Sequence, residues 1–92
     1  MRTVHRYKLD HGTNRIEVPT GWKFLSTGVR PGDLEPSIWL EVPANPVDAG
    51  DVLSVRFVGT GFVVPEHAVE FLGSVIAPTD MPLVWHVYRV SA

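Results

Sequence analysis

Short stretches in which apolar and polar residues alternate cover most of the chain. In residues 52–59, for example, Leu53, Val55 and Phe57 are separated by single polar residues, which is the period expected of a half-buried β-strand. Glycine and proline interrupt the sequence at short intervals and leave no segment long enough for an ordinary helix. The pattern predicts strands at residues 3–9, 15–18, 22–29, 37–42, 52–59, 71–77 and 83–90.

About seven short strands predict an all-β fold, a single small antiparallel β-sandwich or barrel. The first two strands are expected to form a hairpin across the turn-forming residues 10–14. Gly28 interrupts the third strand and predicts a bulge or a close backbone approach there. Residues 65–70 are the one ambiguous stretch, because Pro65 stands at a possible first helical position; at most one helical turn fits.

The most apolar strands supply the predicted core. Its members alternate along three strands, and they are Leu53, Val55, Phe57, Phe71, Val75 and Trp85. The last strand is apolar on both faces, which is typical of a central strand or of a strand with one face at an interface. In the second case the face that includes His86 and Tyr88 is expected to pair with a second copy in a two-fold homodimer.

Length and composition restrict the class of protein. A chain of 92 residues and 10.2 kDa has room for one hydrophobic core, so residues 1–92 are expected to form one domain. The net charge of −2 is spread along the chain without a basic cluster, which argues against nucleic acid as a ligand. The absence of cysteine suits a reducing cytosol, and no apolar run approaches the length of a membrane span. We expect a cytoplasmic protein.

The sequence offers no pattern that points to catalysis. Its four histidines lie far apart and lack the short spacing of a zinc motif. No serine stands in a nucleophile elbow or a recognisable triad context. We therefore expect neither an enzyme nor a need for a metal or cofactor.

Aromatic residues and one glycine-rich turn are the best candidates for binding. Residues 58–62 resemble the start of a phosphate-binding loop, but the third glycine and the following helix are missing. We interpret them as a tight connection that is able to contact a partner. Tryptophan is enriched in binding hot spots. The candidate binding residues are Trp39, Arg56, Gly59, Thr60, Gly61, Phe62, His86 and Tyr88.

Seven segments, taken in order, carry a resemblance to a known family. They are residues 2–7 (RTVHRY), 16–19 (IEVP), 21–26 (GWKFLS), 38–40 (IWL), 56–61 (RFVGTG), 71–75 (FLGSV) and 83–88 (LVWHVY). In order and spacing they are similar to a family of small uncharacterised proteins common in bacteriophage and prophage genomes. Members usually have histidine directly after the Gly-Thr-Gly, where this chain has Phe62.

The resemblance implies a context and no established activity. It implies a small phage protein of the host cytoplasm, encoded outside the virion core genes, that acts by binding. The preference for Gly, Pro, Val and Arg over Lys looks like a GC-rich genome, as in mycobacteriophages and other actinobacterial phages, where some small early proteins are toxic to the host. One route that the resemblance suggests is interference with polar growth or division through a DivIVA-type coiled-coil scaffold.

We expect a non-enzymatic accessory protein that binds a host protein through an aromatic patch or an exposed edge strand. A second hypothesis is a protein that sequesters a small molecule or nucleotide signal, with Arg56 and residues 59–62 as contacts; a pocket lined by Arg56 and Trp39 would favour it. A third is a structural or assembly component of the phage, which would form large regular oligomers.

Overall fold

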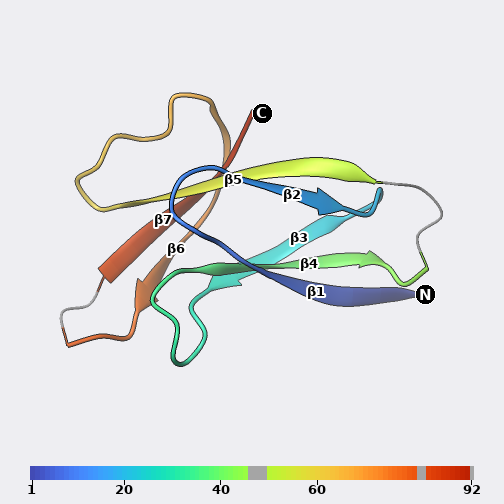
Figure 1. The fold of residues 1–92 in the computed structure, drawn as a ribbon, viewed down its shortest axis with the longest axis horizontal. Helices are drawn as coiled ribbons and strands as arrows, with labels where there is room; N and C mark the ends of the chain where they lie inside the picture. The colour runs from blue at the N-terminus through green and yellow to red at the C-terminus, as the bar shows by residue number, and fades with distance from the viewer. Residues whose placement is uncertain (46–49, 81–82, 92) are drawn as a thin grey trace.

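Two antiparallel β-sheets make up the part of the chain that the computed structural model describes, residues 1–45, 50–80 and 83–91, and this part contains no helix. The strands are β1 (Arg2–Lys8), β2 (Asn14–Val18), β3 (Lys23–Gly28), β4 (Ser37–Pro43), β5 (Asp51–Gly59), β6 (Ala68–Ala77) and β7 (Leu83–Val90). One sheet has the order β1-β4-β3 and the other the order β2-β5-β7-β6 (Figure 1). The predicted all-β sandwich is confirmed.

The core lies between the central strands of the two sheets. Ile38 and Leu40 of β4 are fully buried, as are the alternating Leu53 and Val55 of β5. Side chains of alternate residues point to the same face of a strand, so each strand contributes one apolar row. The core cluster consists of Leu9, Val18, Ile38, Leu40, Val42, Leu53, Val55, Phe57 and Val87. Of the other predicted core residues, Val75 is buried and Trp85 packs against the cluster while remaining half-buried.

The prediction that Phe71 belongs to the core is wrong, because its side chain is 55% exposed. The register explains the difference: Phe71 lies opposite Tyr88, whereas Gly73 lies opposite Val87. One extra residue, Leu72, therefore stands between two consecutive pairs. Such a bulge shifts the alternation by one residue, and it turns Phe71 to the outer face of the sheet.

The predicted hairpin between the first two strands is also wrong. β1 pairs with β4 and β2 with β5, so the two strands belong to different sheets. The segment between them is closed by Asn14, whose side chain accepts a hydrogen bond from the Asp10 N–H at 2.9 Å and donates one to the Asp10 carbonyl at 2.9 Å. Leu9, fully buried, precedes this loop. The chain thus crosses from one sheet to the other.

A bulge does occur in β3, but at Leu25 and not at Gly28. Phe24 lies opposite Leu40 and Ser26 lies opposite Trp39, which leaves Leu25 as the extra residue. The bulge directs Phe24 towards the core and leaves Leu25 42% exposed. At Gly28 a Cβ atom would lie 3.6 Å from Cζ3 of the Trp39 ring, an ordinary van der Waals contact, so neither predicted feature is found there.

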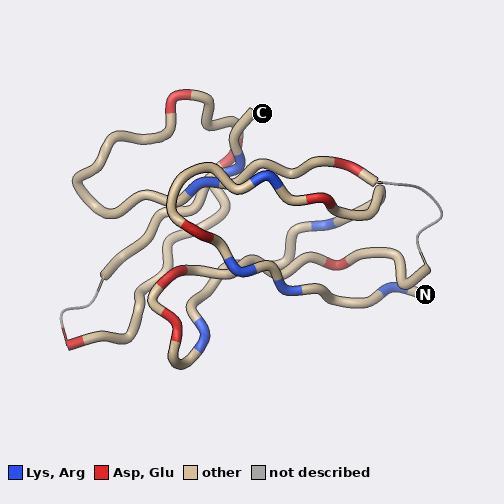
Figure 2. Tube along the Cα trace, in the orientation of Figure 1, with Lys and Arg blue, Asp and Glu red and all other residues tan. Residues whose placement is uncertain are grey.

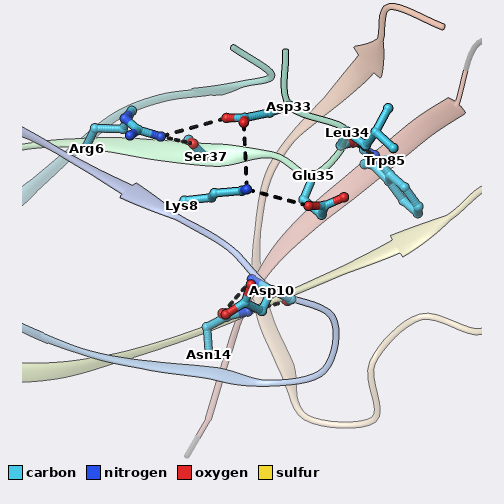
Figure 3. Close-up of polar contacts among 9 residues, drawn as sticks. All are labelled: Arg6, Lys8, Asp10, Asn14, Asp33, Leu34, Glu35, Ser37 and Trp85. Atoms are coloured by element: carbon cyan, nitrogen blue, oxygen red, sulfur yellow. Dashed lines mark hydrogen bonds and ion pairs between the residues drawn. The ribbon is translucent and has the colours of Figure 1, made fainter. Parts of the chain in front are cut away.

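Residues 30–36 connect β3 to β4 and are held on both sides. Lys8 of β1 forms ion pairs of 3.7 Å with both Asp33 and Glu35 (Figure 3). On the other side the indole N–H of Trp85 in β7 donates a hydrogen bond of 2.8 Å to the Leu34 carbonyl. The loop therefore connects the two sheets at this end of the sandwich.

The remaining connection that matters for the site runs from β5 to β6. Figure 1 shows residues 60–67 as a loop that arches beyond β5 before the chain returns to β6. Residues 65–68 form a single turn, in which the Ala68 N–H donates to the Pro65 carbonyl at 3.1 Å, and β6 begins directly at Ala68.

Candidate functional site

The predicted binding residues fall on two opposite sides of the sandwich. Trp39 lies between the buried Ile38 and Leu40, so its side chain is on the outer face of the three-stranded sheet. Arg56 lies between the buried Val55 and Phe57 and is on the outer face of the four-stranded sheet. Because the core separates these two faces, Trp39 and Arg56 do not share a pocket.

Of the other predicted residues, His86 and Tyr88 lie on the outer surface of β6 and β7. We call this surface the β6–β7 face, and its members are Phe71, Ser74, Ile76, Val84, His86 and Tyr88. Phe71 and Ile76 are 55% and 65% exposed. The rings of Phe71 and Tyr88 lie 5.4 Å apart between centroids and are tilted by 58°. In Figure 2 the traces of β6 and β7 carry no charged residue along most of their length. The described residues leave this apolar face open.

His86 lies in the middle of the β6–β7 face and contacts a hydroxyl group on each side. Its Nδ1 atom is 2.7 Å from Ser74 Oγ of β6, and its Nε2 atom is 2.8 Å from Thr60 Oγ1 of the loop after β5. A neutral imidazole has one donor and one acceptor nitrogen, so one hydroxyl donates and the other accepts. Both ring nitrogens are therefore satisfied, and the ring is fixed in its plane.

This arrangement contains two members of a catalytic triad. Ser74 and His86 are at the distance that such a pair requires. The group on the far side of the imidazole is the Thr60 hydroxyl, and among the described residues no carboxylate forms an ion pair with His86. The described residues thus supply a serine and a histidine at this point, but no carboxylate as the third member.

The glycine-rich segment after β5 is a tight turn, as its sequence predicted. The Phe62 N–H donates to the Gly59 carbonyl at 3.1 Å, and Gly61 has a φ of 92°, which favours glycine. A Cβ atom on Gly59 would lie 3.3 Å from the Phe62 ring and 3.6 Å from the Trp85 ring. The missing side chain of Gly59 thus lets the Phe62 ring approach the backbone, while Phe62 stays 76% exposed.

Beside this turn lies an open cleft of about 550 Å³, which we call the Arg56 cleft. Its lining residues are His11, Gly12, Arg56, Phe57, Val58, Gly59, Phe62, Val63 and Trp85. The rings of His11, Phe57 and Trp85 form one cluster, with centroids 5.0 to 5.7 Å apart. A second cavity of about 490 Å³ adjoins it, and Arg56 and Val63 line both.

The sequence predicts five residues of this cleft: Arg56, Gly59 and Phe62 as binding residues, and Phe57 and Trp85 as core residues. His11 was not predicted. It lies in a turn-forming segment, and no residue near it in the sequence indicates its contact with the ring of Phe57, which is 46 residues further on. Ser74 and Phe71 were missed as site residues as well. The bulge at Leu72 places Phe71 on this face, and a single sequence does not locate such a bulge.

Two further properties concern the described residues alone. Among residues 1–45, 50–80 and 83–91, no three His, Asp or Glu side chains are grouped so that they could hold a metal ion. The same part of the chain contains no helix of the length and apolarity needed to cross a membrane.

Comparison with known proteins places the chain in a family. The profile of the family described as "Domain of unknown function (DUF7352)" matches residues 1–92, so the chain belongs to this family over its whole length. No curated protein and no solved structure matches it.

Proposed function

We propose that this member of the DUF7352 family is a non-enzymatic binding protein that docks onto another protein through the β6–β7 face. The observation that carries the proposal is the open face itself, on which Phe71 and Ile76 are more than half exposed and the Phe71 ring lies beside that of Tyr88. Large exposed apolar patches on small domains are typical of interaction surfaces. A second sheet covers only the inner side of β7.

The chemistry of the face suits a protein partner. Phe71 and Tyr88 supply aromatic contact area at one end of the face, and Ile76 and Val84 supply aliphatic area at the other. The fixed Ser74 and Thr60 hydroxyls on either side of His86 have remaining hydrogen-bonding capacity towards solvent. Apolar contact area combined with hydrogen-bonding groups is usual for a protein interface.

The resemblance to phage and prophage proteins extends the proposal to the partner. Under it, the protein acts in the cytoplasm of an actinobacterial host and binds a host protein, with a toxic or inhibitory effect. Interference with a DivIVA-type scaffold of polar growth is one form of this effect. Phage origin, location and effect are supported by the resemblance of the sequence motifs.

A capture experiment with two matched variants tests the docking surface. Ile76 and Val52 are both exposed β-branched residues on the outer face of the same sheet, 65% and 55% exposed, but Val52 is on β5 and outside the β6–β7 face. Tagged wild-type protein, Ile76→Glu and Val52→Glu are used as baits in an actinobacterial lysate, and bound proteins are quantified by mass spectrometry. Circular dichroism checks that all three baits fold.

We expect a host protein that is retained by the wild type and by Val52→Glu and is depleted at least tenfold with Ile76→Glu. A carboxylate buried at the interface without a partner accounts for the loss. A partner that is retained equally by both variants would place the docking surface elsewhere. Loss with both variants would also contradict the proposal.

A further inference from the structure

We propose that the Arg56 cleft is a separate site that binds a small aromatic anion, with the ring of the ligand among His11, Phe62 and Trp85 and its negative group on Arg56. Arg56 lies opposite Tyr88 of the β6–β7 face, but none of the residues that line the cleft belongs to that face. The site gives the chain a second binding activity of a different class.

The rings of Phe62 and Trp85 already line the open space of the cleft. Phe62 is 76% exposed although its ring lies over Gly59 beside Trp85. Trp85 is held in place by its hydrogen bond of 2.8 Å to the Leu34 carbonyl, so its ring does not have to reorient to accept a ligand. A planar ring that enters here covers apolar surface of Phe62 and contacts a wall that is already formed.

The guanidinium group of Arg56 has few hydrogen-bond partners. Among the described residues Arg56 forms no ion pair, and its one polar contact is a long hydrogen bond of 3.5 Å from Nη1 to Thr13 Oγ1. A guanidinium has five N–H donors in a planar fork that matches a carboxylate or phosphate. Most of these donors remain available to a ligand.

Arg56 lines two cavities, and the charges of the other lining residues favour an anion in one of them. The adjoining cavity of about 490 Å³ is lined by Glu66, whose carboxylate would repel an anion. The residues that line the Arg56 cleft include one arginine and no carboxylate. Its volume of about 550 Å³ is within the usual range for small-molecule sites, roughly 300–1,000 Å³.

Titrations with three probes separate the contributions of ring and charge. The ¹⁵N-labelled full chain is titrated with sodium 1-naphthoate, with 1-naphthalenemethanol, which has the same ring without the charge, and with sodium acetate, which has the charge without the ring. The signals followed are the Trp85 indole N–H and the amides of Gly59 and Phe62. We expect naphthoate to shift these signals and to bind at least tenfold more tightly than the other two probes.

Two variants complete the test. Arg56→Gln is expected to weaken naphthoate binding at least tenfold, whereas Lys23→Gln, which removes one positive charge from the other sheet, should change it less than twofold. Equal binding of the acid and the alcohol would overturn the proposal, as would unchanged binding by Arg56→Gln. Shifts confined to the β6–β7 face, or no shift at millimolar naphthoate, would overturn it too. None of these results bears on capture of a protein partner.

Discussion

Trp85 donates its indole N–H to the carbonyl oxygen of Leu34 at 2.8 Å, and this bond joins β7 of one sheet to the loop that leads into β4 of the other. The Trp85 ring also contacts Phe57, with centroids 5.0 Å apart. One residue therefore fills the end of the core, connects the two sheets and forms a wall of the Arg56 cleft. The apolar ring of Trp85 is packed and its N–H has a hydrogen-bond partner, as a partly buried tryptophan requires.

Trp85→Phe should lower the free energy of unfolding by about 1–3 kcal/mol, because the hydrogen bond is lost and the smaller ring leaves a void. Trp39→Phe is the control, since Trp39 lies on an outer face and should cost less than about 1 kcal/mol. Urea denaturation of both variants measures the difference. Equal losses would contradict the role given to the Leu34 contact.

Phe57 and Phe71 give a second matched pair on the same sheet. Phe57 is 4% exposed and Phe71 is 55% exposed. Phe57→Ala should destabilise the domain by about 3–5 kcal/mol, a large part of the stability of a small domain. Phe71→Ala should cost less than about 1 kcal/mol. Thermal unfolding followed by circular dichroism separates the two, and a similar loss for both would show that β6 lacks the bulge at Leu72.

Alanine substitutions at Gly50 and Gly12 distinguish the cost of steric overlap from the cost of backbone strain. Both have a positive φ, 89° and 87° respectively, so alanine is strained at each. A Cβ atom on Gly50 would overlap the Val18 carbonyl, whereas the space around Gly12 is open. Gly12→Ala should cost about 1 kcal/mol. Gly50→Ala should cost at least about 2 kcal/mol more, because backbone must move. Chemical denaturation tests this, and equal costs would contradict the position of Gly50 against β2.

Without a partner, the β6–β7 face is expected to pair with the same face of a second copy in a two-fold dimer. Light scattering should then give a mass near twice 10.2 kDa. Tyr88→Glu should return the mass to that of the monomer, because a carboxylate buried without a partner is unfavourable. A wild-type mass near 10.2 kDa at every concentration would exclude the dimer.

The strand positions were predictable from the sequence because alternation is a local property. The predicted strand 52–59 differs from β5 by one residue, and the predicted strand 83–90 has the bounds of β7. The buried faces of β4 and β5 follow from the same alternation. By contrast, pairing partners depend on residues far apart, which is why β1 was assigned to β2 and not to β4.

The sequence predicts those residues of the candidate site whose residue type alone suggests binding. Arg56, Phe62, His86 and Tyr88 do lie on or beside one side of the four-stranded sheet, but Trp39 lies on the other sheet. The alternation of Trp39 with Ile38 and Leu40 indicates that its side chain points away from the core. It does not indicate which residues that side chain contacts. The contacts of His86 with Ser74 and Thr60 depend on the register of three segments, which local patterns do not contain.

Docking through the β6–β7 face is tested most directly on the complex itself. Captured partner is purified and added to the ¹⁵N-labelled chain, and the loss of amide signal is recorded along the sequence. We predict that the losses concentrate at Phe71, Ser74, Ile76, Val84, His86 and Tyr88. Losses concentrated on β1, β4 and β3, around Trp39, with the β6–β7 signals unchanged, would contradict it.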